Sequence, residues 1–133
     1  MKISKNNAIL CPCGHNKSYA DCCQPYHAWQ KNAKDVETLM RSRYTAYALK
    51  KVDYLVATWH PQTLPTKLAD YLDDAKWIDL RIHGSWQKEN ANEAFVEFTA
   101  RYRNSSGKAE KMHEISRFIK QSDHWFYVDG EVS

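Results

Sequence analysis

All four cysteines of this 133-residue chain lie between positions 11 and 23, in the stretch Cys-Pro-Cys-Gly-His-Asn-Lys-Ser-Tyr-Ala-Asp-Cys-Cys. Buried cysteines without a shared task are scattered along a sequence, so this clustering indicates one common site. Four thiolates complete the coordination of a tetrahedral zinc ion, and soft sulfur ligands favour zinc over hard cations. We therefore predict a zinc site whose four ligands are Cys11, Cys13, Cys22 and Cys23.

Three other arrangements of these thiols stay open from the residues alone. Disulfides persist in oxidising compartments, but we expect no export signal, and a bridge between the neighbours Cys22 and Cys23 would be strained. Four unrelated free thiols are the second alternative. A site of three sulfurs and one imidazole is the third, because His15 and His27 lie close to the cysteines in the sequence.

Turn and cap signals surround the cysteines. Gly14 lets the chain turn sharply after the first pair. Ser18 and Asp21 form a capping pattern that predicts the start of a short helix beside the second pair, where the helix dipole favours thiolates. Pro25 is predicted to end or bend that helix.

The cysteine stretch resembles the SEC-C motif, a short zinc-binding module best known as the tail of the SecA preprotein translocase. His15 and Asn16 stand where the motif usually has serine and glycine, and asparagine tolerates a left-handed backbone better than most residues. The resemblance implies a structural zinc ion and contacts with a protein partner. It covers about a tenth of the chain, and the matching positions are Cys11, Pro12, Cys13, Gly14, Lys17, Tyr19, Cys22 and Cys23.

Helical patterns follow the cysteine stretch. Asp35 is predicted to cap a helix over 36–51, whose apolar residues recur with helical period. Asp53 is predicted to cap a second, short helix that stops before Pro61. A third helical segment is expected over 66–75.

The C-terminal half has strand patterns instead. Short runs of turn residues separate them, which favours antiparallel hairpins. The predicted strands are 78–86, 94–103, 110–120 and 125–128. Helices followed by a meander indicate an α+β fold with about three helices on a curved four-stranded antiparallel sheet. We predict two parts, a zinc-binding module over 1–27 and an α+β domain over 28–133.

Three polar residues are predicted on apolar faces. Arg43 falls within the apolar stripe of the first helix, whereas Arg41 and Ser42 are predicted to point away from it. Glu114 and Ser116 alternate with apolar residues on one face of the third strand. A buried ion pair between Arg43 and Glu114 is one interpretation, because an unpaired buried charge is costly; solvent-facing positions and a catalytic role are the others.

Four longer motifs make the whole chain similar to the YchJ family, in which a SEC-C module precedes a cone-shaped domain of the nuclear-transport-factor-two-like superfamily. This resemblance implies the same α+β fold. The motifs are Arg41-Ser42-Arg43-Tyr44, Thr58-Trp59-His60-Pro61, His113-Glu114-x-Ser116-x-Phe118 and Trp125-x-Tyr127-x-Asp129-Gly130.

Two functions from different classes follow from these patterns. The first is a zinc-dependent adaptor that binds a protein partner through the module. The second is a protein that binds a small molecule, or an isomerase- or hydratase-like enzyme, with a polar pocket formed by Arg43, Trp59, His60, Glu114 and Ser116. The formal charge of +3 argues against nucleic acid. The apolar runs are too short to span a membrane, so we expect a cytoplasmic protein.

Overall fold

The computed structural model describes residues 10–68, 75–89 and 92–133. A short 3-10 helix, η1 (Tyr19–Asp21), and α1 (Gln24–His27) come first, followed by α2 (Val36–Leu49) and α3 (Val52–Ala57). The remaining elements are the strands β1 (Lys76–Gln87), β2 (Glu93–Arg103), β3 (Ala109–Gln121) and β4 (His124–Val132). The predicted order of helices before strands is confirmed.

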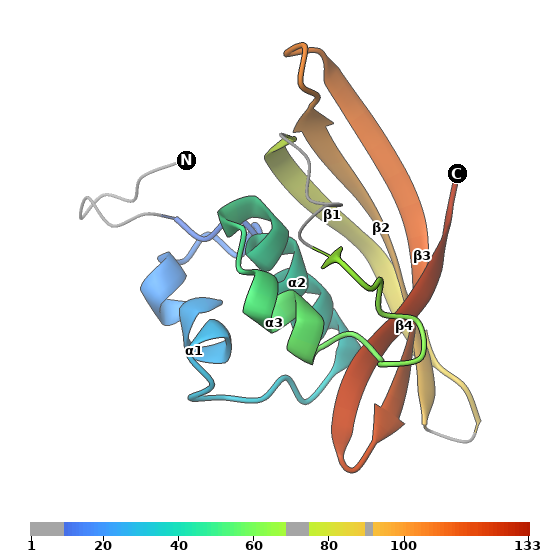
Figure 1. Cartoon of the computed structure of the whole chain (residues 1–133). Coiled ribbons are helices and arrows are strands. Elements are labelled where there is room, and N and C mark those ends of the chain that lie inside the picture. The colour runs from blue at the N-terminus through green and yellow to red at the C-terminus, as the bar shows by residue number, and fades with distance from the viewer. Residues whose placement is uncertain (1–9, 69–74, 90–91) are drawn as a thin grey trace.

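The four strands form one antiparallel sheet in the order β1-β2-β3-β4. The sheet is curved, and α2 and α3 lie on its concave side (Figure 1). In the same view α1 lies on the far side of α2 from the sheet. The cysteine loop reaches the edge strand β1, where a Cβ added at Gly14 would lie 3.7 Å from the Leu80 carbonyl oxygen. The predicted α+β architecture, with helices packed on a curved antiparallel sheet, is therefore confirmed.

The helix caps are partly as predicted. Asp35 accepts a hydrogen bond from the Thr38 amide over 2.7 Å and so begins α2. The helix ends at Lys50, whose φ of 59° reverses the chain. Because Lys51 then becomes the first cap residue of α3, Asp53 lies inside the first turn and is not the predicted cap. Its carboxylate is still favourably placed near the positive end of the helix dipole.

The main core lies between α2 and the sheet. Leu39, Met40 and Tyr44 from α2 pack against a buried layer of the sheet. The alternation of apolar and polar residues in the sequence of β2 matches its burial, because the buried residues are every second one, Ala94, Val96, Phe98 and Ala100. This layer accounts for the position of α2, and none of the four cysteines belongs to it.

The prediction that Ser42 points away from the core is wrong. Ser42 is fully buried, and its hydroxyl lies 2.7 Å from the Tyr54 hydroxyl and donates to the Leu39 carbonyl over 2.8 Å. Arg41 is also partly covered, with a side chain 17% exposed. The physical reason is that α2 packs against the sheet on one side and against α3 and the cysteine loop on the other.

The last strand is longer than predicted, because β4 continues past Val128 to Val132 and pairs with β3 as far as Glu114. The third predicted helix, over 66–75, falls mainly on 69–74, which lie outside the described residues. Within the part of the chain that the structure describes, no helix has the length and apolar character needed to cross a bilayer.

Candidate metal centre and neighbouring cavity

The four cysteine sulfurs meet at one point. Their Sγ atoms all lie within 4.8 Å of one another, and the Cys13 and Cys22 sulfurs are 3.5 Å apart. All four thiols are free, and three of them are buried. A zinc ion with four sulfurs at about 2.3 Å has sulfur–sulfur edges of about 3.8 Å, so the observed spacing fits a tetrahedral metal site.

A tight loop brings the first two sulfurs into position. The Cys11 amide donates to the Lys17 carbonyl over 2.7 Å, which closes the loop like a small hairpin. Gly14 has a φ of 92° and Asn16 a φ of 58°, so both take up the left-handed backbone that the turn requires. The predicted turn at Gly14 is confirmed.

The second pair of cysteines lies between two short helices. Ser18 accepts from the Asp21 amide over 3.2 Å and caps η1, as predicted. Cys22 ends η1 and Cys23 begins α1. Pro25 does not end the helix as predicted but lies in the first turn of α1, where its missing amide hydrogen costs nothing.

Side chains from α2 surround the sulfurs. The buried Thr45 hydroxyl lies 3.3 Å from Cys23 Sγ and 3.5 Å from Cys11 Sγ. The Arg41 guanidinium donates from Nη1 to the Cys13 carbonyl over 2.6 Å. Partners of this kind orient metal ligands and stabilise their charge.

The four sulfurs lie close enough to shift one another's ionisation. Hydrogen bonds from Cys13 and Cys23 lower the pKa of Cys11, whereas the proton shared with Cys11 raises the pKa of Cys13 and of Cys23. Burial raises the pKa of Cys22 to about 12. Protons therefore hold three of the four thiols neutral, and a divalent cation is the natural replacement for them.

Neither histidine belongs to the sulfur cluster. Among the described residues, the group that could hold a metal ion contains the four cysteines alone. His15 is exposed, with Nδ1 3.6 Å from Cys22 Sγ. Both nitrogens of His27 are occupied elsewhere, because Nε2 donates to the Ser42 carbonyl over 2.8 Å and Nδ1 lies 2.7 Å from the Tyr19 hydroxyl. The geometry therefore favours four sulfur ligands over three sulfurs and one imidazole.

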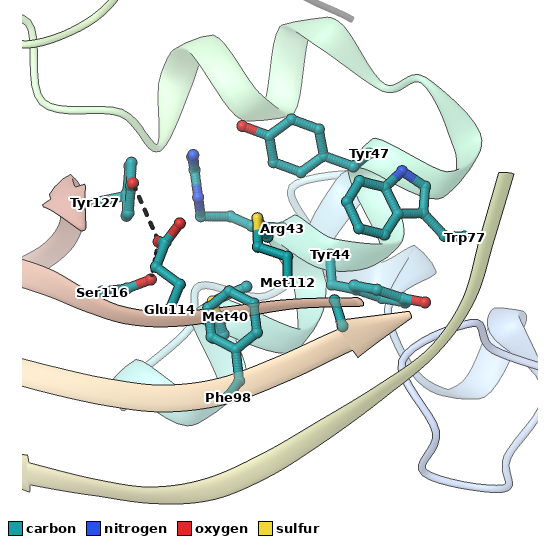
Figure 2. Close-up of a pocket in the computed structure, with 11 residues that line it drawn as sticks. Met40, Arg43, Tyr44, Tyr47, Trp77, Phe98, Met112, Glu114, Ser116 and Tyr127 are labelled. Atoms are coloured by element: carbon teal, nitrogen blue, oxygen red, sulfur yellow. Dashed lines mark hydrogen bonds between the residues drawn. The ribbon is translucent and has the colours of Figure 1, made fainter. Parts of the chain in front are cut away.

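A second feature is a cavity of about 220 Å³ between α2 and the sheet (Figure 2). Its apolar wall consists of Met40, Tyr44, Trp77, Phe98, Ala100 and Met112. The polar groups that line it are Arg43, Tyr47, Glu114, Ser116 and Tyr127. In Figure 2 the side chains of Arg43, Glu114, Ser116 and Tyr127 gather at the end opposite Trp77.

Arg43 is held rigidly in this cavity. It is 2% exposed, and its Nη1 donates to the Leu55 carbonyl over 3.1 Å and to the Thr58 hydroxyl over 2.7 Å. Its guanidinium carbon lies 5.0 Å from the centre of the Trp59 ring and 4.6 Å from that of Tyr127. Burial lowers the pKa of Arg43, but arginine stays protonated at neutral pH.

The predicted ion pair between Arg43 and Glu114 does not form. Among the ion pairs of the described residues none joins these two side chains within 4.0 Å. Instead the Ser116 hydroxyl donates to Glu114 Oε2 over 2.5 Å, and the Tyr127 hydroxyl donates to the same oxygen over 3.3 Å. Arg43 instead donates to the Leu55 carbonyl and the Thr58 hydroxyl and lies against two aromatic rings.

The other two predicted pocket residues lie outside the cavity wall. Trp59 packs edge-on against Tyr127, with ring centres 4.9 Å apart, and its ring face lies against the Arg43 guanidinium. His60 is a turn residue whose Nε2 donates to Gln121 Oε1 over 3.1 Å and whose Nδ1 accepts from the Gln62 amide. The structure therefore brings together Arg43, Glu114 and Ser116.

Comparison with known proteins identifies the family. The family model of the YchJ middle NTF2-like domain matches residues 35–130. The chain belongs to the YchJ family. A UPF0225 protein from Bordetella parapertussis is 45% identical over 134 residues, covering 99% of both chains. Another, from Deinococcus radiodurans, is 46% identical over 120 residues, covering 90% of this chain and 87% of its own.

Solved structures agree with the YchJ assignment. A SEC-C motif containing protein from Rhodopseudomonas palustris has a TM-score of 0.81 and 38% identity, covering 91% of this chain and 96% of that one. A sec-c motif containing protein from Psychrobacter arcticus has a TM-score of 0.76 and 31% identity, covering 92% and 82%. Both are SEC-C motif containing proteins, and the stretch around the four cysteines of this chain matches that motif.

Two groups at these sites carry no sequence signal of their own. Thr45 is one of many threonines, and only the fold shows that its hydroxyl faces the sulfurs. Gly130 pairs with Ser116 across β3 and β4, and a methyl group added there would lie 2.6 Å from Glu114 Cδ. The close approach of this backbone to Glu114 depends on pairing that no local pattern reveals.

Proposed function

We propose that the four-cysteine cluster binds one zinc ion and that the metal-bound loop is a protein-interaction module. The observation that carries the proposal is the convergence of four free sulfurs within 4.8 Å, supplied by both ends of a closed loop. Four protein ligands leave no coordination position for water, so the ion has a structural role. Reduced thiolates favour a cytoplasmic setting.

The loop presents a polar tip that a partner would meet. His15, Asn16 and Lys17 follow the first cysteine pair and are all exposed. The zinc ion fixes the backbone beneath them, because Cys11 and Cys13 precede the tip and Cys22 and Cys23 follow it. We place the module at 1–27 and the rest of the chain at 28–133 as two functional parts.

Metal analysis tests the first half of the proposal. Full-length protein purified without chelator should contain one zinc per chain, and the double variant Cys22→Ser/Cys23→Ser should contain none. His15→Ala and His27→Gln serve as matched controls and should keep the full zinc content. Stoichiometric zinc in the double variant, or its loss in either histidine variant, would contradict a four-cysteine site.

Site-specific crosslinking tests the second half. A photoreactive residue at Lys17, at the tip, should capture a protein in cells, whereas the same residue at the exposed Lys111 of β3 should not capture it. The crosslink should disappear when Cys22 and Cys23 are changed to serine, because the tip is then no longer fixed. Equal capture from both positions would argue against a role for the loop.

A further inference from the structure

The cavity beneath α2 contains one positive and one negative side chain that do not neutralise each other directly. Nη1 of Arg43 has two acceptors, and the Tyr47 hydroxyl also hydrogen-bonds the guanidinium, so these three partners leave part of its five N–H groups unused. Both bonds to Glu114 are received by Oε2, and no described residue donates to Oε1. Each side chain therefore keeps hydrogen-bonding capacity at the cavity, which buried polar groups normally use.

The charges define what the cavity can accept. Arg43 and Glu114 are the two side chains with a formal charge among its lining residues, and these two formal charges sum to zero. Burial raises the pKa of Tyr47 and of Tyr127, which keeps both phenols neutral. A bound anion could pair with Arg43 but would leave the charge of Glu114 unpaired. A bound cation could pair with Glu114 but would leave the charge of Arg43 unpaired. Either arrangement is costly away from water.

The rest of the wall defines size and polarity. Phe98 and Ala100 are buried, and with Met40, Trp77 and Met112 they present apolar surface to the cavity. An apolar cavity of about 150 Å³ accommodates benzene. A volume of about 220 Å³ therefore fits one ring with a short polar substituent.

We propose that this cavity binds an uncharged, ring-sized molecule whose polar group both accepts and donates a hydrogen bond, a carboxamide being the type case. The carbonyl oxygen accepts from an N–H group of Arg43 that Leu55, Thr58 and Tyr47 leave unused. The amide N–H donates to Glu114, and the ring lies against Phe98 and Trp77. This site is separate from the cysteine cluster, since none of its lining residues is a cysteine or forms a hydrogen bond with a cysteine sulfur.

Three probes of nearly equal shape test whether the cavity prefers an uncharged ligand to an ion. Benzamide, benzoate and benzamidinium are titrated into the zinc-loaded full-length protein, and binding is followed by the NMR signals of the Trp77 indole and the Ala100 amide. Benzamide should bind at least about tenfold more tightly than either ion, because it leaves no charge unpaired. Equal affinities for the three probes, or shifts confined to residues outside the cavity, would overturn the proposal.

A single substitution should invert that preference. Glu114→Gln keeps the side-chain shape and changes the sum of the cavity charges from zero to +1. Benzoate should then gain at least about tenfold in affinity relative to benzamide, because its carboxylate pairs with Arg43. If Glu114 has only a structural role, Glu114→Gln will leave the order of the three affinities unchanged. That result would overturn the proposal.

Filling the cavity gives a second, independent test. Ala100→Leu extends into the space from β2 without touching a polar group and should abolish binding of benzamide. Ala109→Leu, at the exposed start of β3, is the matched control and should bind as the wild type does. If Ala100→Leu does not fold, the probe series on the wild type and on Glu114→Gln still decides the matter.

Discussion

The Thr45 hydroxyl lies 3.3 Å from Cys23 Sγ and 3.5 Å from Cys11 Sγ, so one buried side chain of α2 contacts a sulfur from each cysteine pair. A hydroxyl that donates to a thiolate stabilises its charge and fixes its direction. The same helix carries Arg43 into the cavity, on its side facing the sheet. The metal centre and the cavity are thus built on one rigid element.

Thr45→Val tests the first of these contacts. Valine has nearly the shape of threonine and cannot donate, so zinc affinity should fall about 10- to 100-fold while the fold is retained. The measurement is competition with a chromogenic chelator. Thr99→Val, on the sheet face away from the cysteines, should compete as the wild type does. An unchanged affinity for Thr45→Val would show that its hydroxyl does not support the metal.

Removing the metal should loosen the loop and spare the sheet. The main core contains residues of α2 and all four strands but none of the cysteines, whereas the cysteine loop has only a small cluster of its own. After chelation, amide protection should be lost over 10–28 and change less than about tenfold in β2 and β3. Hydrogen exchange measures both at once. Simultaneous loss of protection in the sheet would mean that the metal holds the entire fold.

Replacing Arg43 should weaken the packing between α2 and α3. Arg43→Met keeps the unbranched apolar stem of the side chain. It removes the hydrogen bonds to the Leu55 carbonyl and the Thr58 hydroxyl and the contacts with the Trp59 and Tyr127 rings. We expect a loss of about 1–3 kcal/mol in the free energy of unfolding. Urea denaturation should show a lower midpoint and the same slope. The exposed Arg103→Met should change stability by less than about 0.5 kcal/mol.

His27 should make stability sensitive to mild acid. Burial lowers its pKa below the ordinary value of about 6.5, so the unfolded state binds a proton more readily than the folded state. Stability from this group is complete above about pH 6.5 and is lost as the pH falls through the folded-state pKa. The reason is structural, because Nδ1 accepts from the Tyr19 hydroxyl only while the ring is neutral.

His27→Gln separates this effect from acid release of metal. Glutamine keeps one donor and one acceptor and does not titrate. The free energy of unfolding of the wild type should therefore fall more steeply than that of His27→Gln between about pH 7 and about pH 5. The exposed His124→Gln should follow the wild type. Parallel curves for wild type and His27→Gln would contradict a neutral, half-buried imidazole.

Local patterns predicted the parts of this protein that depend on neighbours in sequence. The cysteine spacing, the Asp35 cap and the alternation in β2 are of this kind. Features that arise from pairing of distant segments were missed. A register shift beside Arg117 and Phe118 places Tyr127 opposite Phe118 and Gly130 opposite Ser116. Tyr127 and Gly130 therefore lie on the same, cavity-facing side of β4, although they are three positions apart in the sequence. Period-two alternation cannot reveal this.

Gly130 is the clearest product of that register shift, and it provides a test of how Glu114 is positioned. A methyl group at Gly130 would lie 2.6 Å from Glu114 Cδ and 2.8 Å from its Cγ, closer than real side chains approach. Gly130→Ala should therefore push the Glu114 carboxylate out of place and cost about 1–3 kcal/mol in the free energy of unfolding. Gly84→Ala, where a methyl group meets nothing within 4 Å, should cost less.

A double-mutant cycle decides whether the cost at Gly130 comes from Glu114. Truncation by Glu114→Ala removes the atoms that the new methyl group would overlap. Gly130→Ala should then cost markedly less in the Glu114→Ala background than in the wild type, with a coupling energy above about 0.5 kcal/mol. Urea denaturation of the four proteins supplies the numbers. Additive costs would mean that the glycine serves the β4 backbone alone and that another contact places the Glu114 carboxylate at the cavity.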